Sequence, residues 1–320
     1  MKYEQLEGIS KNASRLVYGT ASAAVMGSDF EKAADVLDLA WECGFTVIDS
    51  AYAYGNAEEN LGRWMTKRGN RDQIIIIDKG CNPGMVGSED RMSAELIREQ
   101  NRKSLERLQT DHIDFYVLHR DEPLYPVEKV IDVLNEMKAN GNIRRFGVSN
   151  WTLDRIEAGN SYAAENHMEG FTALSPAYSL ADLIGDPWGR SITISGEKNL
   201  KRKEYYLNSG FPIFTYSSLA RGFLSGKFRT DGNSSIEACL SAGTIEEYDY
   251  PVNRRRLAAA ERIAAKKGCT VSQIALCWLL AESRWIFPIV GPSSEKHMKD
   301  NIAALDLELS ETERNELHAK

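Results

Sequence analysis

Eight short apolar runs, each followed by a stretch with helical signals, constrain the fold of this 320-residue chain more than any other feature. The runs are nearly continuous in Val, Ile, Leu and Phe, which is typical of parallel strands buried on both faces. Parallel strands that alternate with helices are joined by right-handed crossovers, and eight such units can close into a barrel. The predicted strands are residues 16–19, 45–49, 74–79, 113–119, 146–149, 171–174, 213–216 and 286–290.

Two of the intervening helices have clear start and stop signals. Ser28 and Glu31 match a capping box at the start of the first helix, and Gly44 is suited to end it. Pro126 fits the first position of another helix, which Gly141 closes. These signals support the alternation of strands and helices that a barrel requires.

Two connections are much longer than the others. They span residues 177–198, after the sixth strand, and residues 220–250, after the seventh. Long loops of a barrel lie over its active-site mouth. Because no change in composition marks a linker, we expect residues 1–320 to form one α/β domain, a (β/α)₈ or TIM barrel.

Composition argues against several classes of partner. The chain is 42% hydrophobic and 27% charged, as in globular proteins, and its net charge of −7 argues against a nucleic-acid partner. Five scattered cysteines without a C-x-x-C pair indicate reduced thiols and a cytoplasmic protein. No window approaches the roughly 18 apolar residues of a membrane helix, and no secretory signal opens the chain. The oligomeric state is not indicated.

Titratable residues stand at the ends of three successive predicted strands. Asp49 ends the second strand, Lys79 the third and His119 the fourth, and Tyr54 follows Asp49 by five residues. Catalytic groups of barrel enzymes come from the carboxyl ends of the strands. We therefore expect these four side chains to share one mouth.

The four residue types suit the reduction of a carbonyl group. A phenol, whose ordinary pKa is about 10, becomes a better acid beside an ammonium group, so Lys79 is expected to lower the pKa of Tyr54. Asp49 would hold the ammonium group in place. His119 would donate a hydrogen bond to the substrate oxygen as negative charge develops there.

At this point the sequence resembles the aldo-keto reductase superfamily over nearly its whole length. The segment FTVIDSAYAYGNAEENLG resembles the family's first signature, and SLERLQTDHIDFYVLH resembles the second. The resemblance implies a TIM-barrel oxidoreductase that uses NAD(P)H to interconvert a small-molecule aldehyde or ketone and an alcohol. It also implies that Asp49, Tyr54, Lys79 and His119 are the catalytic residues.

The resemblance also implies a set of cofactor-binding residues. Ser149 and Asn150 match the pair that binds the nicotinamide carboxamide, Tyr216 matches the aromatic that stacks on the ring, and residues 216–222 resemble the pyrophosphate loop. Residues 291–301 resemble the segment that binds the adenosine end. The full set is Gly19, Thr20, Asp49, Ser149, Asn150, Ser175, Tyr216, Ser217, Ser218, Leu219, Gly222, Lys227, Gly291, Ser293, His297, Asp300 and Asn301.

Three positions depart from the family pattern. Ser175 stands where the family usually has a Gln that contacts the carboxamide, Ser293 stands where many members have Arg, and His297 stands where Gln or Arg is common. The last two departures weaken the usual selectivity for the 2′-phosphate. We still expect NADP(H) to be the preferred cofactor, with NAD(H) as the alternative.

Substrate contacts are less constrained. Arg120, just beyond His119, and Trp188, in the loop after the sixth strand, are candidates, and the polar loops favour a sugar-like or polyol-like substrate. No metal-ligand spacing, dinucleotide-binding G-x-G-x-x-G or nucleophile elbow is present.

Two other functions compete with this one. A glycoside hydrolase could use Glu58 and Asp49 as paired carboxylates, but it leaves Lys79 and Tyr54 unexplained. The resemblance extends to channel-associated β subunits, so a cofactor-binding regulatory or redox-sensing barrel with little turnover is the alternative function.

Overall fold

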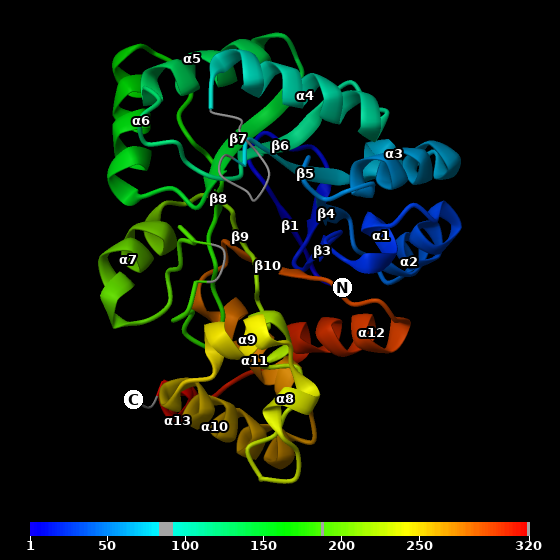
Figure 1. Cartoon of the computed structure of the whole chain (residues 1–320), viewed down its shortest axis with the longest axis vertical. Helices are drawn as coiled ribbons and strands as arrows, with labels where there is room; N and C mark the ends of the chain where they lie inside the picture. The colour runs from blue at the N-terminus through cyan, green and yellow to red at the C-terminus, as the bar shows by residue number, and fades with distance from the viewer. Residues whose placement is uncertain (83–91, 187–188, 319–320) are drawn as a thin grey trace. The chain divides into compact units, whose positions relative to one another are not determined.

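The computed structural model describes residues 1–82, 92–186 and 189–318. Eight parallel strands form a closed barrel in the order β10-β3-β4-β5-β6-β7-β8-β9, which confirms the predicted (β/α)₈ fold (Figure 1). These strands are β3 (Val17–Gly19), β4 (Val47–Asp49), β5 (Ile75–Gly80), β6 (Ile113–Leu118), β7 (Ile143–Ser149), β8 (Leu174–Ser175), β9 (Ile213–Thr215) and β10 (Ile286–Val290).

Helices follow the strands along the chain. The α-helices of the described residues are α1 (Ala23–Met26), α2 (Phe30–Glu42), α3 (Ala57–Arg68), α4 (Ala94–Leu108), α5 (Val127–Ala139), α6 (Leu153–Glu165), α7 (Leu200–Asn208), α8 (Ile236–Cys239), α9 (Ala242–Tyr248), α10 (Pro251–Lys267), α11 (Val271–Glu282), α12 (Glu295–Ala303) and α13 (Glu311–Leu317). Short 3₁₀ turns are η1 (Arg71–Gln73), η2 (Glu197–Asn199), η3 (Ala220–Gly222) and η4 (Ala304–Asp306).

All eight predicted strands overlap a strand of the barrel, but some bounds differ. The starts of β7 and β8 differ most, by three residues each: β7 begins at Ile143 rather than at Phe146, and β8 at Leu174 rather than at Phe171. The start of β7 has a clear cause. Arg144 and Arg145 interrupt the apolar run there, and their side chains are exposed or half-buried while their backbone belongs to the strand. Apolar runs therefore identified the buried part of this strand and missed its polar start.

Both predicted helix starts are one residue too early. The N-cap of α2 is Asp29, whose side chain accepts a hydrogen bond from the Lys32 amide at 3.2 Å, so the capping box predicted at Ser28 does not form. Pro126 has an extended backbone and is the N-cap of α5, which begins at Val127. The first helical residues are thus Phe30 and Val127, each one position later than predicted.

An N-terminal hairpin was not predicted. It consists of β1 (Tyr3–Gln5) paired antiparallel with β2 (Asn12–Ser14). Its strands are short and mostly polar, so they carry no apolar run. Lys11 fastens the hairpin to the barrel, because its ammonium group donates to Asp114 at 2.7 Å and to the Ile74 carbonyl at 2.6 Å.

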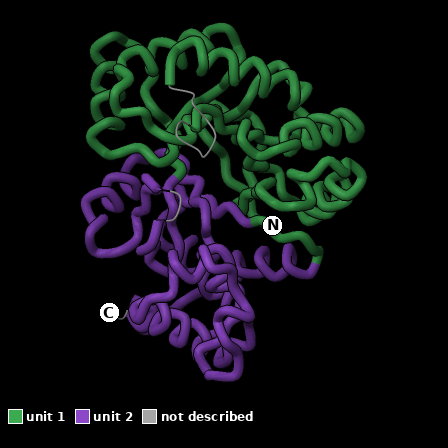
Figure 2. Tube along the Cα trace, in the orientation of Figure 1, with its two compact units in different colours: residues 1–175, 291–295 green, residues 176–290, 296–320 purple. Residues whose placement is uncertain are grey.

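The contacts divide the chain into two compact units, shown in Figure 2. Unit 1 comprises Met1–Ser175 and Gly291–Glu295, and unit 2 comprises Pro176–Val290 and Lys296–Lys320. In unit 1, helices α2 to α6 pack one against the next, and α4 and α5 contact β5 and β7. In unit 2, α10 packs against α11 and α13. The assignment of residues 1–320 to one domain stays a prediction.

Helix α3 approaches α4 so closely that only glycine fits at the contact. A Cβ atom at Gly62 would lie 2.2 Å from the Arg107 carbonyl oxygen, which is backbone and cannot rotate away. In α6, a Cβ atom at Gly159 would lie 2.7 Å from a ring carbon of Phe171, a side chain that can shift. The two positions test the same substitution against a rigid and an adjustable neighbour.

We expect Gly62→Ala to lower the stability of the protein by roughly 1–3 kcal/mol through overpacking, although alanine is the better helix former. Gly159→Ala is the matched control and should cost less, because Phe171 can move. Urea unfolding midpoints of both variants measure the difference. An equal or larger midpoint shift in Gly159→Ala would contradict this account of the α3–α4 contact.

Candidate active site

Asp49 and Lys79 form a buried ion pair at the carboxyl ends of β4 and β5. Asp49 is in register with Ile77 on the neighbouring strand, so Lys79 lies two residues further along on the same face. The Lys79 Nζ atom donates to Asp49 Oδ1 at 2.5 Å and to the Ser50 carbonyl at 2.9 Å. Their side chains are 3% and 5% exposed, so little solvent screens the pair.

The phenol of Tyr54 packs against this ion pair. The turn after β4 holds Tyr54, whose amide donates to the Ala51 carbonyl at 2.9 Å. Lys79 Nζ lies 5.2 Å from the centroid of the Tyr54 ring. The His119 ring meets the Tyr54 ring edge-on, with 5.9 Å between the centroids. The structure therefore brings together all four side chains that the sequence suggested as catalytic.

The pKa of Tyr54 lies above its ordinary value, which differs from the lowering expected from the sequence. Burial is the largest cause and disfavours the phenolate, while the charge of Lys79 acts in the opposite direction and only in part offsets it. The phenol therefore keeps its proton at neutral pH in this structure. A protonated phenol is the form that can donate a proton to a developing alkoxide.

His119 is neutral and Lys79 is charged. Burial, with smaller contributions from the charges of Lys79 and Arg120, lowers the pKa of His119 to about 3. Burial is the largest single influence on Lys79 and would lower its pKa, but the charge and hydrogen bond of Asp49, together with the charges of Tyr54 and Asp78, raise that pKa. The Nδ1 atom of His119 has no hydrogen-bond partner among the described residues. The ring is thus a neutral imidazole beside one fixed ammonium group.

The ends of β7 and β8 provide polar atoms for a nicotinamide carboxamide. Ser149 Oγ donates to the Ser175 carbonyl at 2.8 Å, and Asn150 Nδ2 donates to the His119 carbonyl at 3.1 Å. Asn150 has a left-handed backbone with φ of 59°, an uncommon conformation outside glycine. The buried hydroxyl of Ser175 has no partner within the described residues. An amide group placed there would satisfy that hydroxyl, so these residues fit a carboxamide.

The remaining candidate cofactor residues of unit 1 lie at and after the end of β3, at the end of β4, and in the segment 291–295. Thr20 donates its amide hydrogen to the Asp49 carbonyl at 2.9 Å. A Cβ atom at Gly291 would lie 3.5 Å from the Gly19 carbonyl oxygen, so these two glycines are neighbours. Gly291 and Ser293 are exposed.

In unit 2, the run 216–222 after β9 has unusual backbone geometry. Ser217, Ala220, Arg221 and Gly222 all have positive φ values, between 49° and 99°. Ser218 donates its hydroxyl to the Thr215 carbonyl at 2.8 Å and so fixes the turn. Turns of this kind present consecutive backbone amides to one side and can bind anions, which suits a pyrophosphate.

The other candidates of unit 2 lie in different surroundings. Lys227 and His297 are exposed, and Asn301 is buried. The Asp300 carboxylate accepts hydrogen bonds from Thr270 Oγ1 at 3.0 Å and from Gln273 Nε2 at 2.9 Å. Asp300 thus also helps to fasten α12 to the start of α11.

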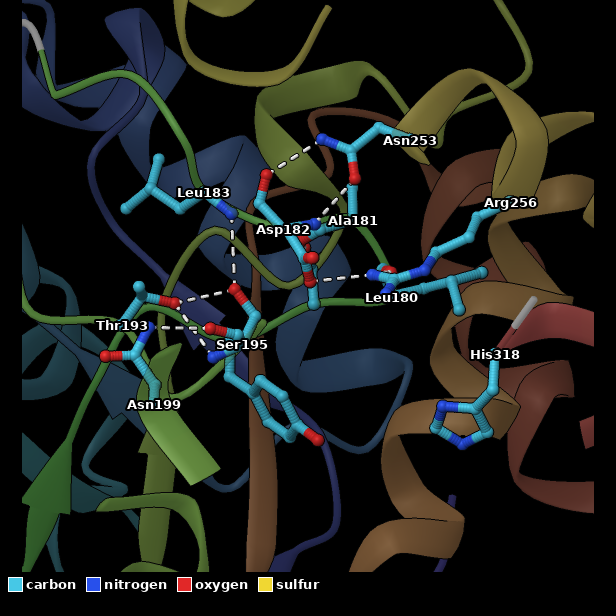
Figure 3. A network of polar contacts seen from close by, with 12 residues as sticks. Leu180, Ala181, Asp182, Leu183, Thr193, Ser195, Asn199, Asn253, Arg256 and His318 are labelled. Carbon is cyan, nitrogen blue, oxygen red and sulfur yellow. Dashed lines mark hydrogen bonds and ion pairs between the residues drawn. The ribbon is translucent and has the colours of Figure 1, made fainter. Parts of the chain in front are cut away.

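Of the two substrate candidates, Trp188 lies outside the described residues. The rest of the loop after β8 is held by the polar network of Figure 3. Asp182 exchanges two backbone-to-amide hydrogen bonds with Asn253, at 2.7 and 2.8 Å, and accepts one from Arg256 at 2.6 Å. Arg120, in unit 1, follows β6, and its amide donates to the Cys81 carbonyl at 3.1 Å.

The sequence did not predict two residues of the surrounding helices that hydrogen-bond to the segments after β5 and β6. Gln100 on α4 accepts a hydrogen bond from the Cys81 amide at 2.7 Å, where Cys81 has a left-handed backbone two residues after Lys79. Arg155 on α6 donates to both oxygens of Asp121, at 3.0 and 3.1 Å, in the loop that follows His119. Each of these contacts joins residues distant in sequence, so no local motif indicates it.

Glu58 does not pair with Asp49 as the glycoside hydrolase alternative would require. It lies on α3, is 1% exposed, and its Oε2 atom accepts a hydrogen bond from Arg107 Nη1 at 2.9 Å. Asp49 is bound to Lys79 instead.

A closed barrel with titratable side chains at the carboxyl ends of its strands has the arrangement of a barrel enzyme. The model of the aldo/keto reductase family matches residues 15–320. The chain belongs to the aldo/keto reductase family, whose members are oxidoreductases that use NAD(P)H.

Individual relatives agree with this membership. The chain is 29% identical to aldo-keto reductase str7 of Strobilurus tenacellus, over 90% of this chain and 80% of the relative. It is 27% identical to a probable voltage-gated potassium channel subunit beta of Oryza sativa subsp. japonica, over 96% and 92%. A thermostable aldo-keto reductase crystallised with the inhibitor epalrestat has the same fold, with a TM-score of 0.73 at 23% identity, covering 99% of this chain and 98% of that one. No helix among the described residues has the length and apolar character needed to cross a membrane.

The ion pair predicts how stability depends on pH. Asp49→Asn removes the charge that keeps Lys79 ionised, and breaking a buried pair in this way costs about 3–5 kcal/mol at neutral pH. The wild-type pair stabilises the protein below the ordinary lysine pKa of 10.5 and loses that contribution as Lys79 deprotonates at higher pH. The stability difference between the variant and the wild type should therefore shrink as the pH rises through 10.5.

Urea unfolding at several pH values tests this dependence. Arg68 and Asp38 form an exposed pair at 2.7 Å, so Asp38→Asn is the control and should cost far less. A constant difference across the alkaline range would mean that Lys79 does not depend on Asp49 for its charge.

Proposed function

We propose that the protein reduces an aldehyde or ketone to an alcohol with NAD(P)H, or catalyses the reverse reaction, with Tyr54 as general acid and base. The observation that carries this proposal is the buried Lys79–Asp49 pair with its ammonium group 5.2 Å from the centroid of the Tyr54 ring. The bound nicotinamide supplies or accepts the hydride. A barrel of this family with those groups in contact has the donors that carbonyl reduction requires.

Each of the four residues has a distinct task in this proposal. The neutral His119 donates a hydrogen bond to the substrate oxygen, and the Tyr54 phenol gives its proton to that oxygen as it gains negative charge. Lys79 stabilises the phenolate that remains, and Asp49 keeps the Lys79 ammonium group in position. In alcohol oxidation the phenolate of Tyr54 takes the proton back.

We propose that Ser149, Asn150 and Ser175 contact the carboxamide of the nicotinamide. The unpartnered buried hydroxyl of Ser175 supports this assignment, although serine is shorter than the usual glutamine. The resemblance assigns the pyrophosphate to residues 216–222 and the adenosine end to residues 291–301, including Lys227 and His297 as candidates for the 2′-phosphate. Basic side chains there favour NADP(H), by less than in members with an arginine at position 293.

For the substrate we propose a small carbonyl compound or alcohol of sugar-like or polyol-like character, on the basis of the polar long loops. Arg120 is a candidate contact because its charge is near enough to lower the pKa of His119. The scattered cysteines favour a cytoplasmic location. A turnover screen of aldehydes, keto sugars and polyols with both cofactors tests the substrate class.

A second candidate function is a cofactor-binding regulatory barrel with little turnover. The similarity to a probable potassium channel β subunit, over 96% of this chain, is the observation that favours it. Cofactor binding without measurable turnover on any carbonyl in the screen, together with capture of a membrane protein partner, would favour this alternative.

We expect Tyr54→Phe to lower kcat by at least about 100-fold, because it removes the transferable proton, a contribution typical of general acid catalysis. Cofactor affinity should stay close to that of the wild type. Tyr52→Phe, in the same turn, is the matched control and should keep most of the turnover. Steady-state kinetics and fluorescence titration with NADPH provide the two readouts, and turnover of Tyr54→Phe above a few per cent of wild type would remove Tyr54 from this role.

The cofactor preference gives a separate prediction. Ser293→Arg should strengthen NADPH binding but not NADH binding, because a guanidinium group binds a 2′-phosphate through charge-assisted hydrogen bonds worth about 1.5–3 kcal/mol. Ser293→Ala removes the hydroxyl without adding charge and is the control. Dissociation constants for both cofactors decide it. An unchanged NADPH constant in Ser293→Arg would mean that the adenosine end binds elsewhere.

A further inference from the structure

A buried cluster of polar atoms lies behind Lys79, on the outward face of β5. It contains both carboxylate oxygens of Asp78, Oε1 of Glu58, the Ser104 hydroxyl and the Tyr116 hydroxyl, and none of these atoms has a hydrogen-bond partner among the described residues. The four residues are at most 1% exposed. Buried polar atoms are nearly always paired, so five unpaired atoms in one cluster require an explanation.

The alternation of side chains along β5 separates this cluster from the proposed active site. Lys79 points toward Asp49, so Asp78 points to the opposite face, toward the helices that cover the strand. Tyr116 is in register with Asp78 on β6, and its hydroxyl lies where a Cβ atom of Gly80 would be, only 1.9 Å from that position. Glu58 reaches the cluster from α3 and Ser104 from α4.

The count of charges leaves one carboxylate without a cation. Lys79 is bound to Asp49, and Arg107 on α4 is bound to Glu58 at 2.9 Å. No arginine or lysine of the described residues forms an ion pair with Asp78, and Lys79, whose charge acts on it, is already paired on the other face of the strand. An isolated ionised carboxylate in such surroundings is costly and takes up a proton instead.

One proton on Asp78 would satisfy two of the unpaired atoms at once. A protonated Asp78 becomes a hydrogen-bond donor, and Glu58 Oε1 is an acceptor that lacks a donor. The groups that face Asp78 support this protonation. Burial raises its pKa well above the ordinary value, the charge of Glu58 raises it further, and Lys79 and the Ser104 hydroxyl act in the opposite direction with smaller effect.

We propose that Asp78 is a neutral carboxylic acid in the folded protein and shares its proton with the Glu58 carboxylate, which Arg107 holds in place. Asp78 is then a positioning residue that acts through Lys79. While Asp78 is neutral, Asp49 is the carboxylate that balances the charge of the Lys79 ammonium group. An ionised Asp78 would add a second negative charge behind Lys79 and oppose the formation of a Tyr54 phenolate.

Infrared spectroscopy tests the protonation without any turnover. We expect the spectrum of the wild type at neutral pH to contain the C=O stretching band of a protonated carboxyl that is missing from Asp78→Asn. Isotopic labelling of the aspartate carboxyl carbon in the wild type should shift the same band, so the test does not depend on the folding of the variant. If neither comparison reveals such a band, the proposal is overturned.

Protein stability at different pH values gives a second test, in which asparagine substitutions of two buried aspartates should change stability in opposite directions. Folding raises the pKa of such a carboxyl above the ordinary value of 3.8. Above pH 3.8 the group therefore destabilises the folded state, and the folding constant falls by up to about tenfold per pH unit. Asp78→Asn should therefore be more stable than the wild type at neutral pH, and its advantage should vanish toward pH 3.8.

Asp114→Asn is the matched control on the neighbouring strand. Asp114 is bound by Lys11 at 2.7 Å and by Arg71 at 3.0 Å, so its substitution should lower stability at neutral pH. An Asp78→Asn variant that is less stable than the wild type at neutral pH, as this control should be, would overturn the proposal.

The effect on Tyr54 rests on the proposed function and has its own test. Glu58→Gln removes the negative charge that raises the pKa of Asp78, so Asp78 should ionise more readily and the pH at half-maximal rate of alcohol oxidation should rise. The double variant Glu58→Gln, Asp78→Asn should return that pH toward the wild-type value. If the pH at half-maximal rate rises by the same amount in the single and the double variant, Asp78 does not act through Lys79. Lack of oxidation in every variant and in the wild type would refute the proposed function instead, while the infrared band would still decide the protonation.

Discussion

The buried ion pair between Lys79 and Asp49 is the interaction on which the proposed site depends. Removing each charge from water costs several kcal/mol, and their attraction offsets this cost only when the geometry is close and the remaining donors are used. The register of β4 and β5 provides that geometry, and the Ser50 carbonyl takes a second hydrogen of the ammonium group at 2.9 Å. The parallel pairing of these two buried strands thus supplies the hydrogen bonds that allow a positive charge to remain in the protein interior.

The fixed charge then determines the state of the neighbouring groups. It contributes to keeping His119 neutral, and it opposes the effect of burial on the phenol of Tyr54. A neutral imidazole and a protonated phenol are both hydrogen-bond donors, so the two rings face the same region as donors rather than as charges. This arrangement favours binding of an oxygen atom that gains negative charge during a reaction.

Sequence patterns predicted the parts of the fold that depend on local burial. The apolar runs identified every barrel strand because both faces of those strands are buried, and the polar residues that end them marked the residues that the structure brings together. The hairpin of β1 and β2 escaped prediction because its strands are short and polar, and Pro126 proved to be a cap rather than a first helical residue. The direction of the pKa shift of Tyr54 could not be predicted either, since it depends on burial in three dimensions, which outweighs the nearby ammonium group.

The contacts that join distant segments were equally beyond the sequence. Asp78 stands within an apolar run of the sequence, and only the structure reveals that α3 and α4 bring Glu58 and Ser104 to it, with Arg107 paired to Glu58. Three buried aspartates on adjacent strands thus meet the same physical problem in different ways. Asp49 and Asp114 are compensated by cations, whereas Asp78 is paired with no cation of the described residues and has a carboxylate as neighbour. Since Asp78 and Lys79 are consecutive and point to opposite faces, β5 separates a charged pair from a cluster whose neutrality requires a proton.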